Sequence, residues 1–365
     1  MRYYKLPFII LFLSVFVSCI KSEPANAEAD ITACIVDGDI LKKDPIIQNK
    51  RIQLFVKSDT DLSNQAPEFE LTPGASISPE SGTSRNFTTS KTYTVISEDG
   101  GSVKEYEVAY TISALGSEYN FEHVRLENDK YDVFYEVDGE GKTVMDWASG
   151  NVGFSIVGGN ASPDEYPTSR LLNGKDGQGA KLTTRSTGTF GVQIGKPIAA
   201  GNLFMGEFDL ANSITDPLKS LKLGVPIDFI PSALKGFYKY EAGPVYTNID
   251  NEEEDQEDSW DVYAIFFETD EDLKFLDGTN RFTHPNIVSI ARIPESERVE
   301  ADEWTSFFIP FELVDGKQID PQKLNDGKYS LTLVFTSSIS GDLFSGAVGS
   351  TLLIDEVELI HADND

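Results

Sequence analysis

Short alternating runs of apolar and polar residues, separated by Gly, Pro, Asn and Asp, fill most of this 365-residue chain and leave almost no helical periodicity. A period of two places side chains on opposite faces of a strand, so such runs build sheets that bury one face. This pattern predicts an all-β protein of packed antiparallel sheets. After residue 119 the candidate strands are Asp132–Val137, Val152–Val157, Gly188–Ile194, Leu203–Phe208, Val262–Glu268, Ile287–Ile293, Ser306–Phe311, Tyr329–Thr336 and Ser350–Leu359.

The first eighteen residues have the features of a secretory signal. Arg2 and Lys5 are basic, and the apolar run over residues 6–17 is too short and wrongly flanked for a membrane span. Ser18 directly before Cys19 resembles the lipobox of bacterial lipoproteins, in which the cysteine is lipidated and becomes the mature N-terminus. We therefore predict a lipoprotein signal peptide over 1–18 and a lipid anchor on Cys19 in the outer membrane of a diderm bacterium, at the cell surface. The alternative is an ordinary cleaved signal followed by a stray cysteine.

The formal net charge of −30 disfavours nucleic acid as a partner, because an acidic surface repels a phosphate backbone. Calcium suits such a chain better, since it takes hard oxygen ligands. Beyond Cys19 the only cysteine is Cys34, in an alternating run, and we interpret it as a buried apolar group. The three histidines are far apart without ligand spacing, so no zinc site is expected.

Two β-rich blocks follow a polar segment over residues 19–29, which we interpret as a flexible tether. In the block 30–114, the alternating runs Lys91–Ile96 and Lys104–Ile112 are joined through Asp99-Gly100-Gly101, a pattern that predicts a hairpin in a small β-sandwich. The boundary with the second block, 115–365, is expected near residues 114–117, where small residues cluster.

The first block carries two recognisable strand motifs, Ile31…Ile35-Val36-Asp37-Gly38 and Tyr93-Thr94-Val95-Ile96-Ser97-Glu98-Asp99-Gly100…Tyr106-Glu107-Val108. Together they resemble the immunoglobulin-like N-terminal modules of bacterial surface lipoproteins. The resemblance implies a spacer or stalk, with no catalytic residues.

The second block carries a longer set of motifs: Met145-Asp146-Trp147-Ala148-Ser149-Gly150-Asn151, Tyr166-Pro167-Thr168-Ser169, Ala199-Ala200-Gly201-Asn202-Leu203-Phe204-Met205-Gly206, Ser337-Ser338-Ile339-Ser340-Gly341-Asp342 and Leu353-Ile354-Asp355-Glu356-Val357. This set resembles the putative carbohydrate metabolism domain of bacterial surface lipoproteins over residues 119–361. The resemblance implies a jelly-roll β-sandwich similar to carbohydrate-binding modules, with no established reaction.

Aromatic residues of the second block are the candidates for glycan binding. Tyr238 and Tyr240 share one face of a strand about 7 Å apart, a spacing at which sugar rings can stack on both. The alternative is that both are core residues. Trp260 follows the acidic segment 250–258 and is expected to be exposed, and Tyr166 is the fourth candidate.

A structural calcium ion is a second candidate feature. Carbohydrate-binding jelly rolls often hold calcium between their opening strand and a closing Ile-Asp-x-Val strand, and Glu122 and Asp355 occupy similar positions here. The alternative role for Asp355 is to cap a turn. The adjacent acids of 250–258 lack the spacing of a calcium loop and are expected to form a solvated connection.

The sequence offers no motif for a catalytic acid and base, a nucleophile or a phosphate loop. We therefore favour a non-catalytic lipoprotein that binds a glycan or polysaccharide and has surface proteins as further partners. A glycoside hydrolase and a fimbria-like structural or adhesion subunit are the alternatives.

Overall fold

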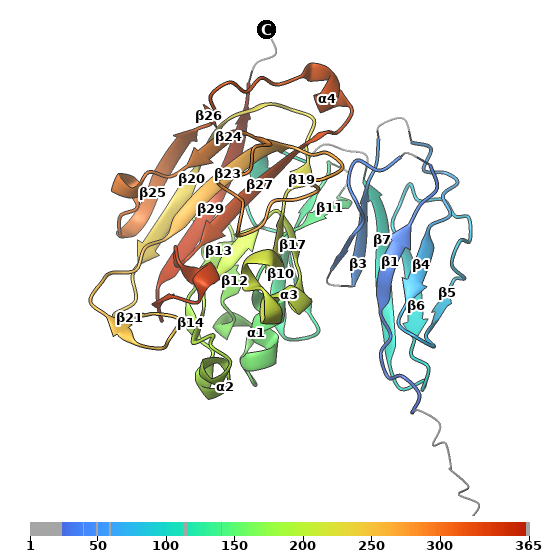
Figure 1. The fold of residues 1–365 in the computed structure, drawn as a ribbon, viewed down its shortest axis with the longest axis horizontal. Helices are drawn as coiled ribbons and strands as arrows, with labels where there is room; N and C mark the ends of the chain where they lie inside the picture. The colour runs from blue at the N-terminus through green and yellow to red at the C-terminus, as the bar shows by residue number, and fades with distance from the viewer. Residues whose placement is uncertain are drawn as a thin grey trace, which may run out of the picture.

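The structure is a computed structural model that describes residues 24–38, 40–48, 50–57, 60–111, 115–139 and 141–362. It consists of a smaller and a larger domain, both built mainly of antiparallel strands (Figure 1). The all-β fold class predicted from the alternating pattern is therefore confirmed. Cys19 and residue 114 of the expected domain boundary lie outside the described residues.

The smaller domain packs a five-stranded sheet, in the order β2-β3-β7-β6-β5, against the pair β1-β4. The predicted hairpin is present as β6 and β7, and β3 pairs with β7 in parallel. The strands are β1 (Ile31–Ile35), β2 (Ile46–Gln48), β3 (Arg51–Phe55), β4 (Glu68–Leu71), β5 (Ser76–Ser78), β6 (Lys91–Ile96) and β7 (Val103–Thr111).

The core of the smaller domain includes residues that lie before and within its first strand. Cys34 is buried in this core, as expected, and burial raises the pKa of its thiol to about 12. Ala29 is fully buried in the same core, and the main chain of Asn26 is hydrogen-bonded to Asp99 N and to the Glu98 carboxylate. The tether predicted over 19–29 is therefore wrong for residues 26–29, because these residues pack on the sandwich.

The larger domain has two main sheets. Sheet 1 has the order β12-β13-β29-β20-β25, with β8 beside β29, and sheet 2 has the order β16-β27-β23-β24-β26, with β19 beside β27. Their strands are β8 (Glu118–Tyr119), β12 (Thr168–Leu171), β13 (Gly179–Thr183), β16 (Asn202–Phe204), β19 (Val225–Pro226), β20 (Pro231–Glu241), β23 (Asp261–Glu268), β24 (Ile287–Arg292), β25 (Ala301–Pro310), β26 (Glu312–Leu313), β27 (Tyr329–Thr336) and β29 (Thr351–His361).

Smaller strand groups surround these sheets. They are β9 (Val124–Glu127), β10 (Tyr131–Val137) and β11 (Thr143–Asp146); β14 (Arg185–Ser186) and β15 (Ile198–Ala199); β17 (Gly206–Phe208) and β18 (Leu221–Leu223); and β21 (Tyr246–Thr247), β22 (Glu253–Glu254) and β28 (Gly346–Ala347). The strand predicted over 203–208 is divided into β16 and β17 at Met205.

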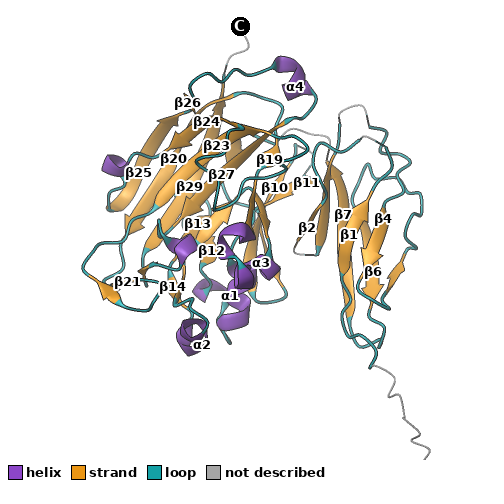
Figure 2. Ribbon diagram, in the orientation of Figure 1, coloured by secondary structure: helices purple, strands orange, loops and turns teal. Residues whose placement is uncertain are grey.

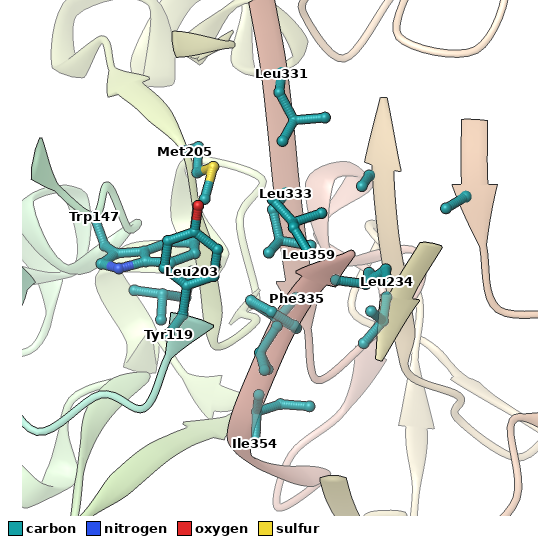
Figure 3. Packing of buried hydrophobic residues seen from close by; sticks show 14 of the residues in the cluster. Tyr119, Trp147, Leu203, Met205, Leu234, Leu331, Leu333, Phe335, Ile354 and Leu359 are labelled. Carbon is teal, nitrogen blue, oxygen red and sulfur yellow. The ribbon is translucent and has the colours of Figure 1, made fainter. Parts of the chain in front are cut away.

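The main core lies between the two sheets, where Leu234, Ile354 and Leu359 of sheet 1 face Leu331, Leu333 and Phe335 of sheet 2 (Figure 3). Strand β23 has buried apolar side chains on both faces of sheet 2. Val262, Ala264 and Phe266 belong to the main core, whereas Tyr263, Ile265 and Phe267 belong to a separate cluster on the other face. Sheet 2 therefore has an outer face that is covered by further chain.

Part of this cover comes from short helices gathered at one end of the larger domain (Figure 2). The strands predicted over 152–157 and 188–194 are wrong, because these segments form α1 (Asn151–Val157) and α2 (Gly188–Gln193). A short apolar run fits a buried helix as well as a strand, and the buried amide of Asn151 holds α1 in place by hydrogen bonds to both main-chain groups of Thr168. The remaining helices are α3 (Leu210–Thr215) and α4 (Pro321–Asn325).

The two domains contact each other through buried cations. The Arg51 guanidinium of β3 donates to the carbonyl of Thr143 in the larger domain at 3.0 Å and pairs with Glu107 at 2.7 Å. Lys43 donates to the carbonyl of Gly224 and is buried in that contact. Ile46 and Phe55 extend the main core across the boundary, so the smaller domain is packed on the larger one.

Candidate functional site

A cavity of about 300 Å³ lies on the outer face of sheet 2, opposite the main core. Its floor is formed by β16, β23 and β27, which contribute Phe204, Tyr263 and Val334. Its walls come from α1, α2 and the segments 196–200 and 336–344. Residues of α1 and α2, the two helices that replace predicted strands, thus line the sides of this pocket.

Charged groups are concentrated on one side of the pocket. The Asp261 carboxylate, at the start of β23, is buried and pairs with Arg292 at 2.7 Å and with Arg298 at 3.6 Å. Arg281 pairs with Asp342 at 2.7 Å, and both residues line the cavity. Burial raises the pKa of the Tyr263 hydroxyl, so this group is a neutral hydrogen-bonding partner at physiological pH.

Two polar atoms on this side retain hydrogen-bonding capacity. Among the residues that the structure describes, Asp261 Oδ1 accepts no hydrogen bond and Arg281 Nε donates none, although both atoms are buried. Buried polar atoms are nearly always satisfied in folded proteins. Arg298 Nε lies 3.6 Å from Asp261 Oδ1, which is beyond hydrogen-bond distance. A ligand hydroxyl that reaches either unsatisfied atom would satisfy it, because a hydroxyl donates to a carboxylate and accepts from a guanidinium.

The opposite side of the pocket is apolar. Phe154 and Ile156 of α1, Phe190 and Ile194 at α2, and Phe344 line the cavity. Lys196 lies over the Phe344 ring at 4.9 Å, and burial lowers the pKa of its ammonium group. The arrangement offers aromatic and aliphatic contact surface on one side and hydrogen-bonding groups on the other.

A buried carboxylate fixes the segment that forms one wall. Asp258 Oδ2 accepts hydrogen bonds from Ser338 Oγ at 2.5 Å, Ser350 Oγ at 2.7 Å and the Ala347 amide at 2.7 Å. Ser338 also contacts Thr184 Oγ1 and lines the pocket. Burial raises the pKa of Asp258, and the hydrogen bonds from its partners offset part of this effect. The sequence analysis did not single out this residue within the acidic segment.

The predicted stacking platform is wrong in this structure, because its aromatic rings are not accessible. Tyr238 and Tyr240 are 2 % and 3 % exposed, and Trp260 is 0 % exposed. The Trp260 ring packs between the two sheets, 4.2 Å from Tyr238 and 6.1 Å from Tyr240. The alternative interpretation of the two tyrosines as core residues describes their position, and Trp260 is their packing partner.

Tyr166 is also buried and cannot stack on a ligand directly. Its ring lies 5.3 Å from Tyr131 and 5.3 Å from Phe154. Phe154 in turn lines the pocket, so Tyr166 supports the wall from behind.

Glu122 and Asp355 are brought to the same loop, residues 174–178. Glu122 Oε1 accepts a hydrogen bond from the Gln178 amide at 2.8 Å, and Asp355 Oδ2 accepts from the Lys175 amide at 2.6 Å. A Cβ atom at Gly177 would lie 1.8 Å from Glu122 Oε1, and one at Gly174 would lie 2.4 Å from Asp355 Oδ2. Glycine is therefore required at both positions for the loop to approach the two carboxylates.

Other expectations concern metals and membranes. Within the described ranges, no group of three or more His, Cys, Asp and Glu side chains is arranged to hold a metal ion. Residues 251–257 are exposed, as expected for a solvated connection. No helix among the described residues is long and apolar enough to cross a membrane.

Part of the pocket lining comes from the motifs of the second block. Gly150 and Asn202 line it from two of these motifs, and Ser338, Gly341 and Asp342 line it from a third. Segments far apart in the sequence thus meet at one cavity. Arg281 and Asp261 do not belong to these motifs, and no pattern in the sequence marked them as site residues.

The fold and the pocket define a class: a two-domain all-β protein with a smaller sandwich and a pocket on the outer face of its larger sandwich. The model of the putative carbohydrate metabolism domain matches residues 120–360, and the chain belongs to this family. The N-terminal SGBP model matches residues 34–110. The predicted two-part organisation is thereby confirmed, and the chain is a glycan-related protein of cell-surface type.

Solved structures show the same architecture. A crystal structure from Bacteroides thetaiotaomicron, described as a putative glycoside hydrolase, is 50% identical, covers 94% of this chain and 100% of its own, and superposes with a TM-score of 0.89. A second, from Bacteroides vulgatus and described in the same words, is 40% identical, covers 68% of this chain and 99% of its own, and has a TM-score of 0.65. No curated protein matches the chain significantly.

Proposed function

We propose that this protein is a non-catalytic, lipid-anchored glycan-binding protein of the outer membrane, and that the pocket on the outer face of sheet 2 holds the glycan. The observation that carries the proposal is a cavity with aromatic walls whose lining includes Asp261 and Arg281, two residues that each keep a polar atom without a hydrogen-bond partner. Hydroxyl groups of a sugar pair with such atoms, and the faces of its ring pack on aromatic side chains. The family match and the SGBP-type N-terminal domain agree with a glycan ligand.

The glycoside hydrolase named for the two crystal structures is the second candidate. Hydrolysis uses two carboxyl groups, one of which must carry a proton to donate. The carboxylates that line the pocket are Asp261 and Asp342, and each forms an ion pair with arginine. Each of these carboxylates is thus already engaged by an arginine, an arrangement that we take to suit binding better than hydrolysis.

A calcium ion is a further part of the proposal. The carboxylates of Glu122 and Asp355 are hard oxygen ligands, and both lie against the loop 174–178. These two residues would hold the ion together with main-chain oxygens and water. Bound calcium would fix the loop between β12 and β13 and would have no part in a reaction.

A glycan array tests the function. The chain from Ile20 onward is applied as wild type and as Arg281→Met, with Arg170→Met as the matched control, since Arg170 pairs with the buried Asp132 outside the pocket. We expect wild type and Arg170→Met to give the same glycan signals and Arg281→Met to lose them. Signals that survive in a folded Arg281→Met variant would place glycan binding elsewhere, and release of a cleaved sugar by wild type would favour the hydrolase.

A further inference from the structure

The mouth of the pocket is apolar and open to solvent. Ile156, Phe190 and Ile194 line the cavity, yet they are 51%, 53% and 42% exposed. The polar residues Asp261 and Tyr263 lie deeper, since they are 2% and 4% exposed. The pocket therefore has a polar base and an apolar mouth, which are different environments for the two ends of one ligand.

A sugar matches the polar base, but at the mouth only the faces of its ring find matching contacts. Each hydroxyl that loses water must find a hydrogen-bonding partner, and an unpaired hydroxyl buried against Phe or Ile side chains opposes binding. The three side chains at the mouth, on α1 and at the end of α2, carry no polar atom. An apolar group therefore fits the mouth better than a further sugar unit does.

We propose that the ligand is an amphipathic glycoside, a sugar joined to an alkyl, acyl or aryl group. This inference rests on the proposed glycan function and deepens it. The sugar pairs with Asp261 and Arg281 at the base, and the apolar group covers Phe190 and Ile194 at the mouth. The exposed apolar residues at the mouth also line the cavity. A single ligand that enters the cavity can cover them, whereas a flat protein surface could not follow them inward.

Isothermal titration calorimetry on the chain from Ile20 onward tests the inference with methyl, hexyl and phenyl glycosides of the terminal sugar of the strongest array ligand. Burial of each methylene strengthens binding by about fourfold, so we expect the hexyl glycoside to bind at least tenfold more tightly than the methyl glycoside. The hexyl and phenyl arms distinguish an alkyl-bearing from an aryl-bearing ligand, and stronger binding of either one supports the proposal.

Phe190→Ala should remove most of this gain, so that the variant binds the hexyl and methyl glycosides with similar affinities. Phe308→Ala is the matched control, because Phe308 is 60% exposed on sheet 1 and does not line the cavity. Thermal unfolding of both variants establishes that they fold.

Each remaining outcome contradicts the inference. Equal affinities for methyl, hexyl and phenyl glycosides would overturn it and leave the glycan function intact. Failure of all three glycosides to bind would overturn the glycan function as well. Concentration-dependent dimerisation that Phe190→Ala abolishes, without any preference among the glycosides, would assign the mouth to a second copy of the chain.

Discussion

Tyr238 and Trp260 pack against each other in the centre of the larger domain, with ring centroids 4.2 Å apart and an angle of 37° between the ring planes. Tyr238 comes from sheet 1, and Trp260 directly precedes β23 of sheet 2. The contact therefore joins the two sheets, and both residues contribute to stability rather than to ligand binding.

Tyr238→Ala should accordingly lower the free energy of unfolding by about 3–5 kcal/mol, as truncation of a buried aromatic ring does. Urea unfolding measures the change, and Phe308→Ala on the same sheet provides the exposed control. If Tyr238→Ala lost glycan affinity without losing stability, Tyr238 would be a binding residue and not a core residue.

The strands were predictable because alternation in a strand depends on nearby residues. The predicted strand Tyr329–Thr336 agrees with β27 at both ends, and Val262–Glu268 differs from β23 by one residue. The resemblance between motifs suggested Glu122 and Asp355 as calcium ligands, whereas their contacts with the loop 174–178 carried no signal in the sequence. Local alternation thus predicts the strands but not the contacts between distant segments.

The pocket was not predictable in the same way. Asp261, Arg281 and Asp342 come from separate segments, and only the packing of sheet 2 with its covering loops brings them together. The prediction that Trp260 is exposed was wrong because residues 251–257 of the acidic loop are themselves exposed but say nothing about the side chain that follows them. One residue of that loop, Asp258, is in fact a buried hydrogen-bond acceptor.

Glu136 should make stability depend on pH. Its carboxylate accepts a hydrogen bond from the Trp147 indole at 2.7 Å, and burial raises its pKa from 4.5 to about 7 despite that bond. Between these values the unfolded chain loses the proton while the folded chain keeps it, so stability falls as pH rises from 4.5 to 7.

Glu136→Gln should remove this decrease and raise the stability at pH 8, relative to wild type, by up to about 3 kcal/mol. Thermal unfolding of both proteins at pH 4.5 and pH 8 gives the comparison. A difference between the two proteins that is the same at both pH values would show that Glu136 does not titrate in this range.

Calcium should stabilise the folded chain if Glu122 and Asp355 hold it. Burial raises the pKa of Asp355 to about 6, and a cation beside this carboxylate would favour its charged form. Calcium should therefore raise the melting temperature, EDTA should lower it, and Asp355→Asn should remove the difference. Identical melting curves in calcium and in EDTA would rule out the ion.

Lipidation of Cys19 can be tested on the whole chain in cells. Cys19→Ser should abolish incorporation of radiolabelled palmitate and release the protein from the membrane fraction, because the thiol is the site of acylation. Cys34→Ser is the control, since Cys34 is buried in the smaller domain. Unchanged labelling of Cys19→Ser would contradict the lipoprotein assignment.

The most direct test of the binding site compares two buried, arginine-paired aspartates. Asp261 lies in the pocket, whereas Asp132, which pairs with Arg170, lies outside it. Calorimetry with the strongest array ligand should show that Asp261→Asn weakens binding by at least about tenfold, the effect of losing a hydrogen bond to a charged group, and that Asp132→Asn leaves the affinity unchanged. Equal affinities of the folded Asp261→Asn variant and wild type would contradict the assignment of this pocket as the glycan site.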